Sequence, residues 1–200
     1  MRKTVVTIIS MLMVATAVSA QDITLPQPKK TGGMPLMEAL NKRQSIRSYT
    51  DERIDTQTLS NLLWAAWGYN RDDKRTAPSG MNKQEIDLYV VLRSGAYLYD
   101  AKANQLVLIN KKDIRKNVGA DQEFSQNAPL NIVFVADKTK GDGAMTAAYI
   151  SQNIYLFCAS EGLGTVARGS FKPEAIQKDL KLSEKQKIVL VQPVGKPNDN

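Results

Sequence analysis

The clearest periodic pattern in the chain is a helical one in its first third. Apolar residues between Leu59 and Ala66 recur every three or four positions, which is typical of a helix with one apolar face. Asp55 precedes this pattern and is a good N-cap, while Gly68 follows it. The pattern therefore predicts a helix over residues 55–68.

The longest helical pattern covers Gly143–Glu161, and Gly162 follows it as a C-cap. Shorter helices are predicted over residues 37–42, 112–117 and 173–180, the last beginning with proline near its first turn. Apolar or alternating runs bounded by turn residues predict strands and a hairpin. The strands are expected at 87–92, 131–136, 165–167 and 187–193, and the hairpin at 97–99 and 106–109 around a polar turn at 102–104.

Helices and strands mix without strict alternation along the chain, so the pattern favours an α+β fold over a doubly wound one. Residues 69–81 are predicted to form a polar loop, because they are rich in charged residues and contain Pro78 and Gly80. Residues 21–35 are predicted to form an extended leader, and residues 36–200 a single domain.

The first twenty residues have the pattern of a secretory signal peptide. Arg2 and Lys3 precede an apolar run at 5–14, and small residues end the segment at 18–20. The apolar run is short for a membrane span, so an uncleaved anchor is the less favoured alternative. We expect cleavage before Gln21, export to the periplasm or the medium, and no stable membrane anchor.

Composition excludes several classes of chemistry. The chain has no histidine and one cysteine, Cys158, so Ser-His-Asp triads, Cys-His pairs, zinc sites built on His or Cys, and disulfides within one chain are excluded. We assign no catalytic side chain and no metal ligand. Acid–base work falls to Asp, Glu, Lys or Tyr, or to a cofactor. Cys158 is expected to be a small buried residue.

The net charge of +7 comes from basic residues spread along the chain. Without a dense basic run, a solvated basic surface is favoured over nucleic-acid binding.

Three segments carry candidate binding chemistry. In the first, Arg43 and Arg47 flank Ser45. Two guanidinium groups and a hydroxyl can clamp a phosphate through charge-assisted hydrogen bonds, although such residues after a helix are usually only solvated.

The second segment contains Ser79, Gly80, Asn82 and Gln84. The two amides can pair with the edge of a flat heterocycle, and an ordinary polar turn is an equally good interpretation. The third segment follows the long helix, where glycines let a backbone approach a planar ligand closely. A helix cap explains Gly162 and the turn after it, but not Gly169.

In this order, the three segments resemble the nitroreductase family, over roughly residues 35–197. The matching motifs are Arg43-x-Ser45-x-Arg47, Pro78-Ser79-x-x-Asn82-x-Gln84, a helix containing Gln152-Asn153 that ends at Gly162-Leu163-Gly164, and Val194-Gly195-Lys196-Pro197. The resemblance implies a central, mainly antiparallel sheet flanked by helices, a homodimer, and FMN as the cofactor. The hairpin at 97–100 also resembles the SagB-type dehydrogenase branch.

The resemblance also implies roles for individual residues. Arg43 and Ser45 would hold the FMN phosphate, and Arg47 would lie near the N1–C2 carbonyl side of the ring system. The backbone at Arg168 and Gly169 would face flavin N5.

In the same way, Asn82 would meet the pyrimidine edge together with Gln84, and Ser79 and Gly80 would come from the partner chain. The sequence departs from the family pattern at Glu85 and Ile86, where many members have a proline and an aromatic residue. It also lacks the basic residues that many members carry after the last motif, so Lys196 is a possible substitute in the phosphate site.

The resemblance to the nitroreductase family implies an oxidoreductase that passes electrons from a small-molecule donor through FMN to a nitroaromatic, quinone or similar acceptor. The alternative is an exported flavin-binding or flavin-free interaction protein with the same fold and no turnover.

Overall fold

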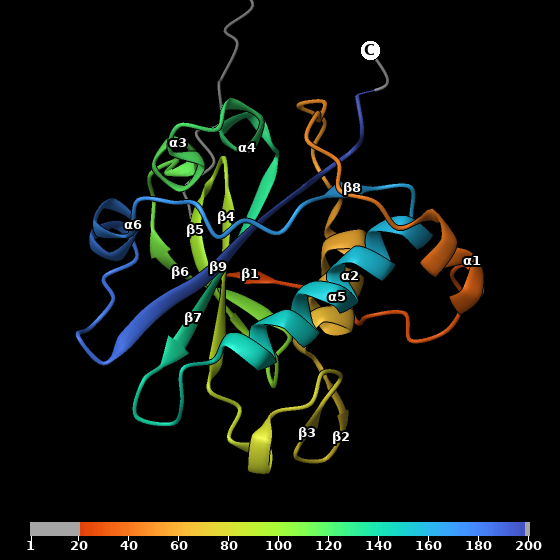
Figure 1. The fold of residues 1–200 in the computed structure, drawn as a ribbon, viewed down its shortest axis with the longest axis horizontal. Helices are drawn as coiled ribbons and strands as arrows, with labels where there is room; N and C mark the ends of the chain where they lie inside the picture. The colour runs from red at the N-terminus through yellow and green to blue at the C-terminus, as the bar shows by residue number, and fades with distance from the viewer. Residues whose placement is uncertain (1–20, 199–200) are drawn as a thin grey trace, which may run out of the picture.

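An antiparallel sheet of seven strands, in the order β1-β6-β5-β4-β7-β9-β8, forms the centre of the computed structural model, which describes residues 21–198 (Figure 1). The predicted signal peptide lies outside the described residues. The strands of the sheet are β1 (Ile23–Thr24), β4 (Ile86–Leu92), β5 (Gly95–Asp100), β6 (Gln105–Asn110), β7 (Leu130–Asp137), β8 (Gly164–Thr165) and β9 (Gln186–Gly195). The helices are α1 (Leu36–Lys42), α2 (Thr56–Trp67), α3 (Arg115–Gly119), α4 (Glu123–Asn127), α5 (Ala144–Ser160) and α6 (Pro173–Asp179).

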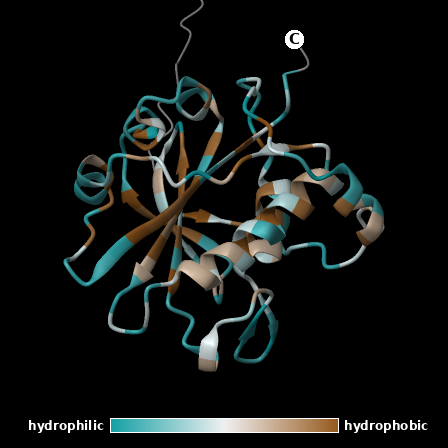
Figure 2. Ribbon diagram, in the orientation of Figure 1, coloured by the Kyte–Doolittle hydropathy of each residue, from teal (hydrophilic) through white to brown (hydrophobic). Residues whose placement is uncertain are grey.

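Both faces of the sheet are covered by helices, which explains why its central strands are apolar almost throughout. On β4, Leu88 and Val90 pack into the core beneath α2 and α5. The alternating residues Tyr89 and Val91 pack against α3 and α6 on the other face. The central strands are correspondingly hydrophobic along their length in Figure 2. The predicted α+β architecture is confirmed.

The long helix α5 has glycine at both ends, as the sequence predicts. Gly143 has φ 72°, and a Cβ there would lie 2.6 Å from a methyl carbon of Ile86, so this N-cap needs glycine. At the other end Gly162 has φ 66°, and the Leu163 N–H donates to the Cys158 carbonyl at 2.8 Å. The Cys158 side chain is buried, as expected, and burial raises the pKa of its thiol.

Residues 69–81 are not a plain loop. They form a two-stranded hairpin, β2 (Tyr69–Arg71) and β3 (Lys74–Arg75), followed by a 3₁₀ turn over Gly80–Asn82. The Arg75 guanidinium lies 4.0 Å from the ring centre of Tyr69 and 4.9 Å from that of Trp67. The charged residues that indicate a loop in the sequence therefore include a side chain stacked on two aromatic rings.

Smaller differences occur elsewhere along the chain. The helix expected at 112–117 begins at Arg115, because the Asp113 carboxylate accepts the Arg115 N–H at 3.1 Å, and the short helix α4 was not predicted. The last strand extends two residues further than expected, to Gly195.

The leader crosses α2 and is fixed to it by hydrogen bonds. After β1, the Pro26 carbonyl accepts from the Ser60 hydroxyl at 2.5 Å, and the Lys29 N–H donates to Asn61 Oδ1 at 2.8 Å. The Pro26 carbonyl also accepts from the Asn104 amide at 2.8 Å. Residues 21–35, for which an extended leader is predicted, are bound to the domain by these hydrogen bonds.

Asp55 is the N-cap of α2, as predicted. Its carboxylate accepts from Gln57 N, Thr58 N and Thr58 Oγ1 at 2.9, 2.9 and 2.6 Å, and the Thr58 side-chain bond, followed by that from its N–H, lowers the pKa of Asp55. Asp55→Ala is expected to lower the free energy of unfolding by about 1 kcal/mol at neutral pH. Asp55→Asn, which keeps an acceptor oxygen, is expected to lose less.

The pH dependence follows from the lowered pKa. The carboxylate stabilises the folded chain fully above its unfolded-state pKa, and this contribution is lost as the pH falls through the lower folded-state pKa. Denaturant titrations should therefore show the difference between the wild type and Asp55→Ala shrinking in acid. A difference that persists unchanged at about pH 2.5 would contradict the role of the ionised cap.

Candidate functional site

The segment Arg43–Arg47 leaves α1 and runs beside β8. The Ile46 N–H donates to the Thr165 carbonyl at 3.0 Å, and the Ile46 side chain lies so close to Gly164 that a Cβ there would be 2.8 Å from its Cγ2. The Tyr49 hydroxyl donates to the Ile46 carbonyl at 2.5 Å. Ile46 thus anchors the segment, while Arg43 remains half-buried and Ser45 and Arg47 are exposed.

A tyrosine on α5 joins this segment to the one that follows the helix. The Tyr155 hydroxyl lies 3.1 Å from Ser45 Oγ and accepts the Ala167 N–H at 2.8 Å. The Arg43 guanidinium carbon lies 5.1 Å from the centre of the Tyr155 ring, which is within the range of a cation–π contact. Tyr155 therefore contacts both predicted segments without belonging to either.

A cleft of about 440 Å³ opens beside Arg43, between the segment and the C-terminal half of α5. Its lining includes Arg43, Ile46, Tyr155, Thr165 and Pro197, but neither Ser45 nor Arg47. Within residues 21–198, no ion pair involves either arginine. Two cations without acidic partners, next to a hydroxyl, form a donor set that suits a phosphate.

The last predicted motif also lies here. The Lys196 carbonyl accepts the Thr50 N–H at 3.0 Å, which places the turn beside the end of the Arg43–Arg47 segment. The Lys196 ammonium forms an ion pair with Glu52. Its charge is therefore shared with a carboxylate, unlike those of Arg43 and Arg47.

Arg168 does not have the role predicted for it. Its N–H and carbonyl both pair with Val191, at 2.8 and 3.1 Å, so its backbone is not available to a cofactor. Its side chain turns inward, and only 4% of the residue is exposed. Gly169, in contrast, is exposed, and a Cβ added to it would meet nothing within 4 Å. Of the predicted pair, only Gly169 leaves open space for a planar ligand.

The Arg168 guanidinium binds the segment from α3 to α4. The partners of its hydrogen bonds are the Val118 carbonyl at 3.2 Å, the Gly119 carbonyl at 2.9 Å, Gln122 Oε1, Ser125 Oγ at 2.6 Å and the Ser170 carbonyl at 2.9 Å. Burial lowers the pKa of Arg168. No carboxylate is among these partners, so this buried cation is held by neutral acceptors alone.

The loop Ser79–Gln84 is strained, and its amides have partners within the chain. Asn82 and Gln84 have φ values of 54° and 46°, which are uncommon outside glycine. The Gln84 amide accepts from Arg75 Nε at 2.9 Å and donates to the Asp73 carbonyl at 2.6 Å. It also donates to Asn82 Oδ1 at 3.0 Å. In this conformation the amides hold the loop, and their pairing with a heterocycle stays a prediction.

Two other predicted residues lie in the same loop. Ser79 Oγ accepts the Gln84 N–H at 3.0 Å, whereas nothing would lie within 4 Å of a Cβ on Gly80. The loop is at the N-terminal end of α5, and the Arg43–Arg47 segment is at its C-terminal end (Figure 1). One chain therefore brings the first, third and last motifs together and leaves the second motif apart.

A family model described as the nitroreductase family matches residues 40–196. The chain belongs to the nitroreductase family. It is 29% identical to a protein of Methanocaldococcus jannaschii named as a nitroreductase, over 88% of this chain and 96% of that protein.

Solved structures of nitroreductases agree with this membership. One from Ralstonia eutropha JMP134, described as a nitroreductase, is 37% identical with a TM-score of 0.85, over 93% of this chain and 94% of the other. Another, from Clostridium difficile R20291, is described as an FMN-dependent nitroreductase. It is 23% identical with a TM-score of 0.61, over 82% and 88% of the two chains. The nitroreductase-like fold expected from the motifs is confirmed.

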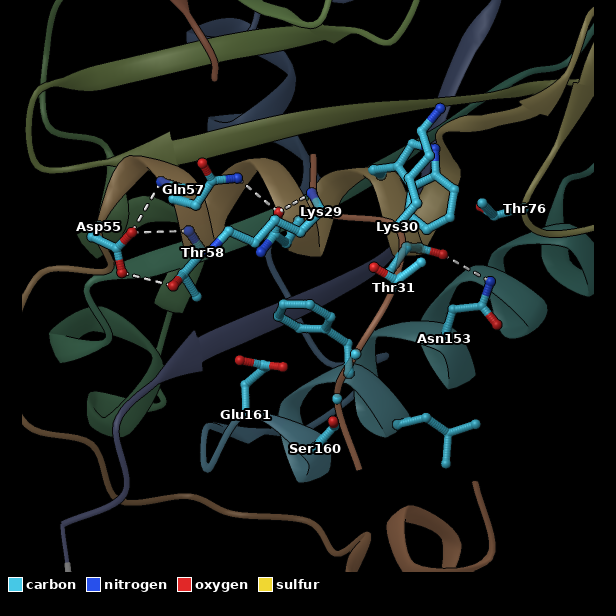
Figure 3. Close-up of a pocket in the computed structure, with 17 residues that line it drawn as sticks. Lys29, Lys30, Thr31, Asp55, Gln57, Thr58, Thr76, Asn153, Ser160 and Glu161 are labelled. Atoms are coloured by element: carbon cyan, nitrogen blue, oxygen red, sulfur yellow. Dashed lines mark hydrogen bonds between the residues drawn. The ribbon is translucent and has the colours of Figure 1, made fainter. Parts of the chain in front are cut away.

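A further pocket of this nitroreductase fold lies away from the predicted binding residues. It measures about 780 Å³ and is enclosed by the leader, α2 and α5 (Figure 3). Lys29, Asn61 and Asn153 line it, and Asn153 is part of the helix motif. Its amide donates to the Ala65 carbonyl at 3.0 Å, so the motif asparagine joins α5 to α2.

The sequence analysis did not single out Tyr155, although the position of this residue on the helix gave a signal. The residue lies two helical turns before Gly162, on a helix that was expected to end at the third segment. Among residues 21–198, no cluster of three His, Cys, Asp or Glu side chains could hold a metal ion. No helix in the same range is long and apolar enough to cross a membrane.

Proposed function

We propose that this chain is an FMN-dependent oxidoreductase, in which electrons from a reduced donor pass to a nitroaromatic, quinone or similar small acceptor. The observation that carries the proposal is the Arg43 guanidinium, which lines a 440 Å³ cleft beside the Ser45 hydroxyl and has no ion-pair partner in residues 21–198. The description of the Clostridium difficile relative as FMN-dependent supports the choice of cofactor.

The residues present fit FMN. Arg43 and Ser45 would bind its phosphate, and the cation of Arg47 would favour the anionic reduced ring system. The backbone of the exposed Gly169 would approach the ring where the chain leaves open space. FMN, when bound, supplies hydride acceptance and donation at N5.

Two measurements test this proposal. Mature protein refolded with FMN and then freed of excess ligand should retain the yellow flavin absorption, and a colourless protein would overturn the proposal. Oxidation of NADH or NADPH in the presence of a nitroaromatic separates an enzyme from a flavin-binding protein without turnover. A flavin-binding protein without turnover is the alternative to the proposed enzyme.

We also propose that the protein works as a homodimer, because α1 and α5 expose large apolar side chains. Met37 is 75% exposed and Met145 is 69% exposed, and Tyr149 lies one turn beyond Met145. Burial of such a surface against a second copy would stabilise a dimer. Ser79 and Gly80 would then reach the site of the second copy.

Light scattering of the mature protein is expected to give twice the mass of one chain. Met145→Asp, at the exposed N-terminal end of α5, should shift the population to monomer by at least about tenfold in dissociation constant. Lys178→Asp on α6, at the opposite face of the sheet, should leave the mass unchanged. A flavin-loaded monomer of the wild type would contradict the proposal.

Export remains a proposal that rests on residues 1–20. N-terminal sequencing of protein from its native host should begin at or near Gln21. An intact Met1 in a cytoplasmic fraction would contradict it.

A further inference from the structure

We propose that Tyr155 is a positioning residue of the anion site, which fixes the Ser45 hydroxyl as an outward donor and holds the Arg43 guanidinium beside it. The inference rests on the proposed function, because the anion is taken to be the phosphate of FMN. It adds a residue that lies on the helix of the third motif but is not one of the positions that define the motif.

The Tyr155 hydroxyl has two hydrogen-bond partners within residues 21–198, and we assign a direction to each bond. The Ala167 N–H can only donate, so the Tyr155 oxygen accepts that bond, at 2.8 Å. The remaining partner of the Tyr155 hydroxyl within residues 21–198 is Ser45 Oγ, at 3.1 Å. With one lone pair used by Ala167, the Tyr155 proton is free to bond Ser45, and we take Tyr155 as the donor of this bond.

This arrangement leaves the Ser45 proton free. Ser45 has no other hydrogen-bond partner in the described part of the chain, and its side chain is exposed. A serine that accepts a hydrogen bond from Tyr155 points its own O–H away from the tyrosine. A phosphate oxygen can accept that proton, because it has lone pairs and no proton of its own to donate. The Tyr155 hydroxyl thus prepares Ser45 to bind an anion without contacting that anion itself.

The ring of Tyr155 has a second effect, on Arg43. The guanidinium carbon lies 5.1 Å from the ring centre, so the arginine is held over an aromatic face by a cation–π contact. No carboxylate within residues 21–198 forms an ion pair with its N–H groups. A carboxylate in this place would neutralise the cation. A tyrosine ring orients the guanidinium and leaves its charge available to the phosphate.

Tyr155 itself is held rigidly. It belongs to α5, whose neighbouring residue Ile154 is fully buried, and its bond to Ala167 fixes it to a strand-like segment that pairs with β9 through Arg168. A positioning residue on a packed helix keeps the donors of a site in place more accurately than a residue on a loop.

The test is a double-mutant cycle on ligand affinity. Dissociation constants for FMN and for riboflavin are measured by flavin fluorescence for the wild type, Tyr155→Phe, Ser45→Ala and the double variant, and melting curves confirm that each variant folds. Tyr155→Phe keeps the ring over Arg43 and removes only the hydroxyl. It should weaken FMN binding about threefold to tenfold and change riboflavin binding less than about twofold.

The cycle distinguishes positioning from packing. If Tyr155 acts through Ser45, the double variant should bind FMN no more weakly than Ser45→Ala alone. Strictly additive losses, an unchanged FMN affinity in Tyr155→Phe, or equal losses for FMN and riboflavin would each overturn the inference while leaving the proposed function intact. A wild-type protein that binds neither flavin would overturn both.

Discussion

Arg43→Ala is expected to weaken FMN binding by roughly ten- to a hundredfold. A hydrogen bond to a charged group contributes on the order of 1.5–3 kcal/mol, and each 1.4 kcal/mol or so is a factor of ten in affinity. Because Arg43 lines the cleft and lacks an ion-pair partner in residues 21–198, the variant loses this contact directly. Riboflavin, which has no phosphate, should lose far less affinity.

Two controls make this measurement specific. Lys42→Ala removes a neighbouring cation that is paired with Glu38 at 2.9 Å, and it should change neither affinity appreciably. Arg47→Ala should weaken FMN and riboflavin alike and lower the reduction potential of the bound flavin, because Arg47 is placed near the ring. Equal losses of both ligands in Arg43→Ala would show that the phosphate lies elsewhere.

Arg168→Leu is expected to lower the free energy of unfolding by about 3 kcal/mol or more. The substitution leaves the carbonyls of Val118, Gly119 and Ser170 without the guanidinium that satisfies them, and each unsatisfied buried group costs about 1–3 kcal/mol. For a chain of this size, the melting temperature should fall by roughly 6–12 °C. Denaturant and thermal unfolding measure both quantities.

A neighbouring ion pair provides the control. Lys172 contacts Asp121 at 2.7 Å and joins the same two parts of the chain as Arg168, but both side chains are exposed. Lys172→Met should therefore cost less than about 1 kcal/mol. If Arg168→Leu lowered the free energy of unfolding as little as Lys172→Met does, the buried hydrogen bonds of Arg168 would stabilise the fold no more than the exposed ion pair.

Much of this fold could be predicted because its signals are local. The N-cap at Asp55, the glycines around α5 and the apolar runs of the central strands each act within a few residues of the element that they define. Signals that depend on distant residues were missed. The Arg168 guanidinium, for example, binds carbonyls about fifty residues earlier in the chain.

The same distinction explains the outcome for the candidate site. Motif spacing identified Arg43 and Gly169, whose surroundings leave them open to a ligand. It could not show that Arg168 turns inward, because the carbonyls that bind it come from α3, about fifty residues earlier. It could not assign the Gln84 amide to Arg75 and Asp73 either, since the hairpin that carries these partners was expected to be a loop.

The two edges of the sheet determine how copies of this chain can meet. At one edge, the two residues of β1 pair with β6. The Asp22 carboxylate also accepts the Leu108 N–H of β6 at 2.8 Å, so backbone donors that a foreign strand would need are already occupied. At the far edge, β8 is equally short, and its Thr165 carbonyl is taken by Ile46. Edge-to-edge strand addition, the usual route to fibrous aggregates, is therefore blocked at both ends. Deletion of residues 21–27, which include β1 and Asp22, would expose the β6 edge of the sheet again.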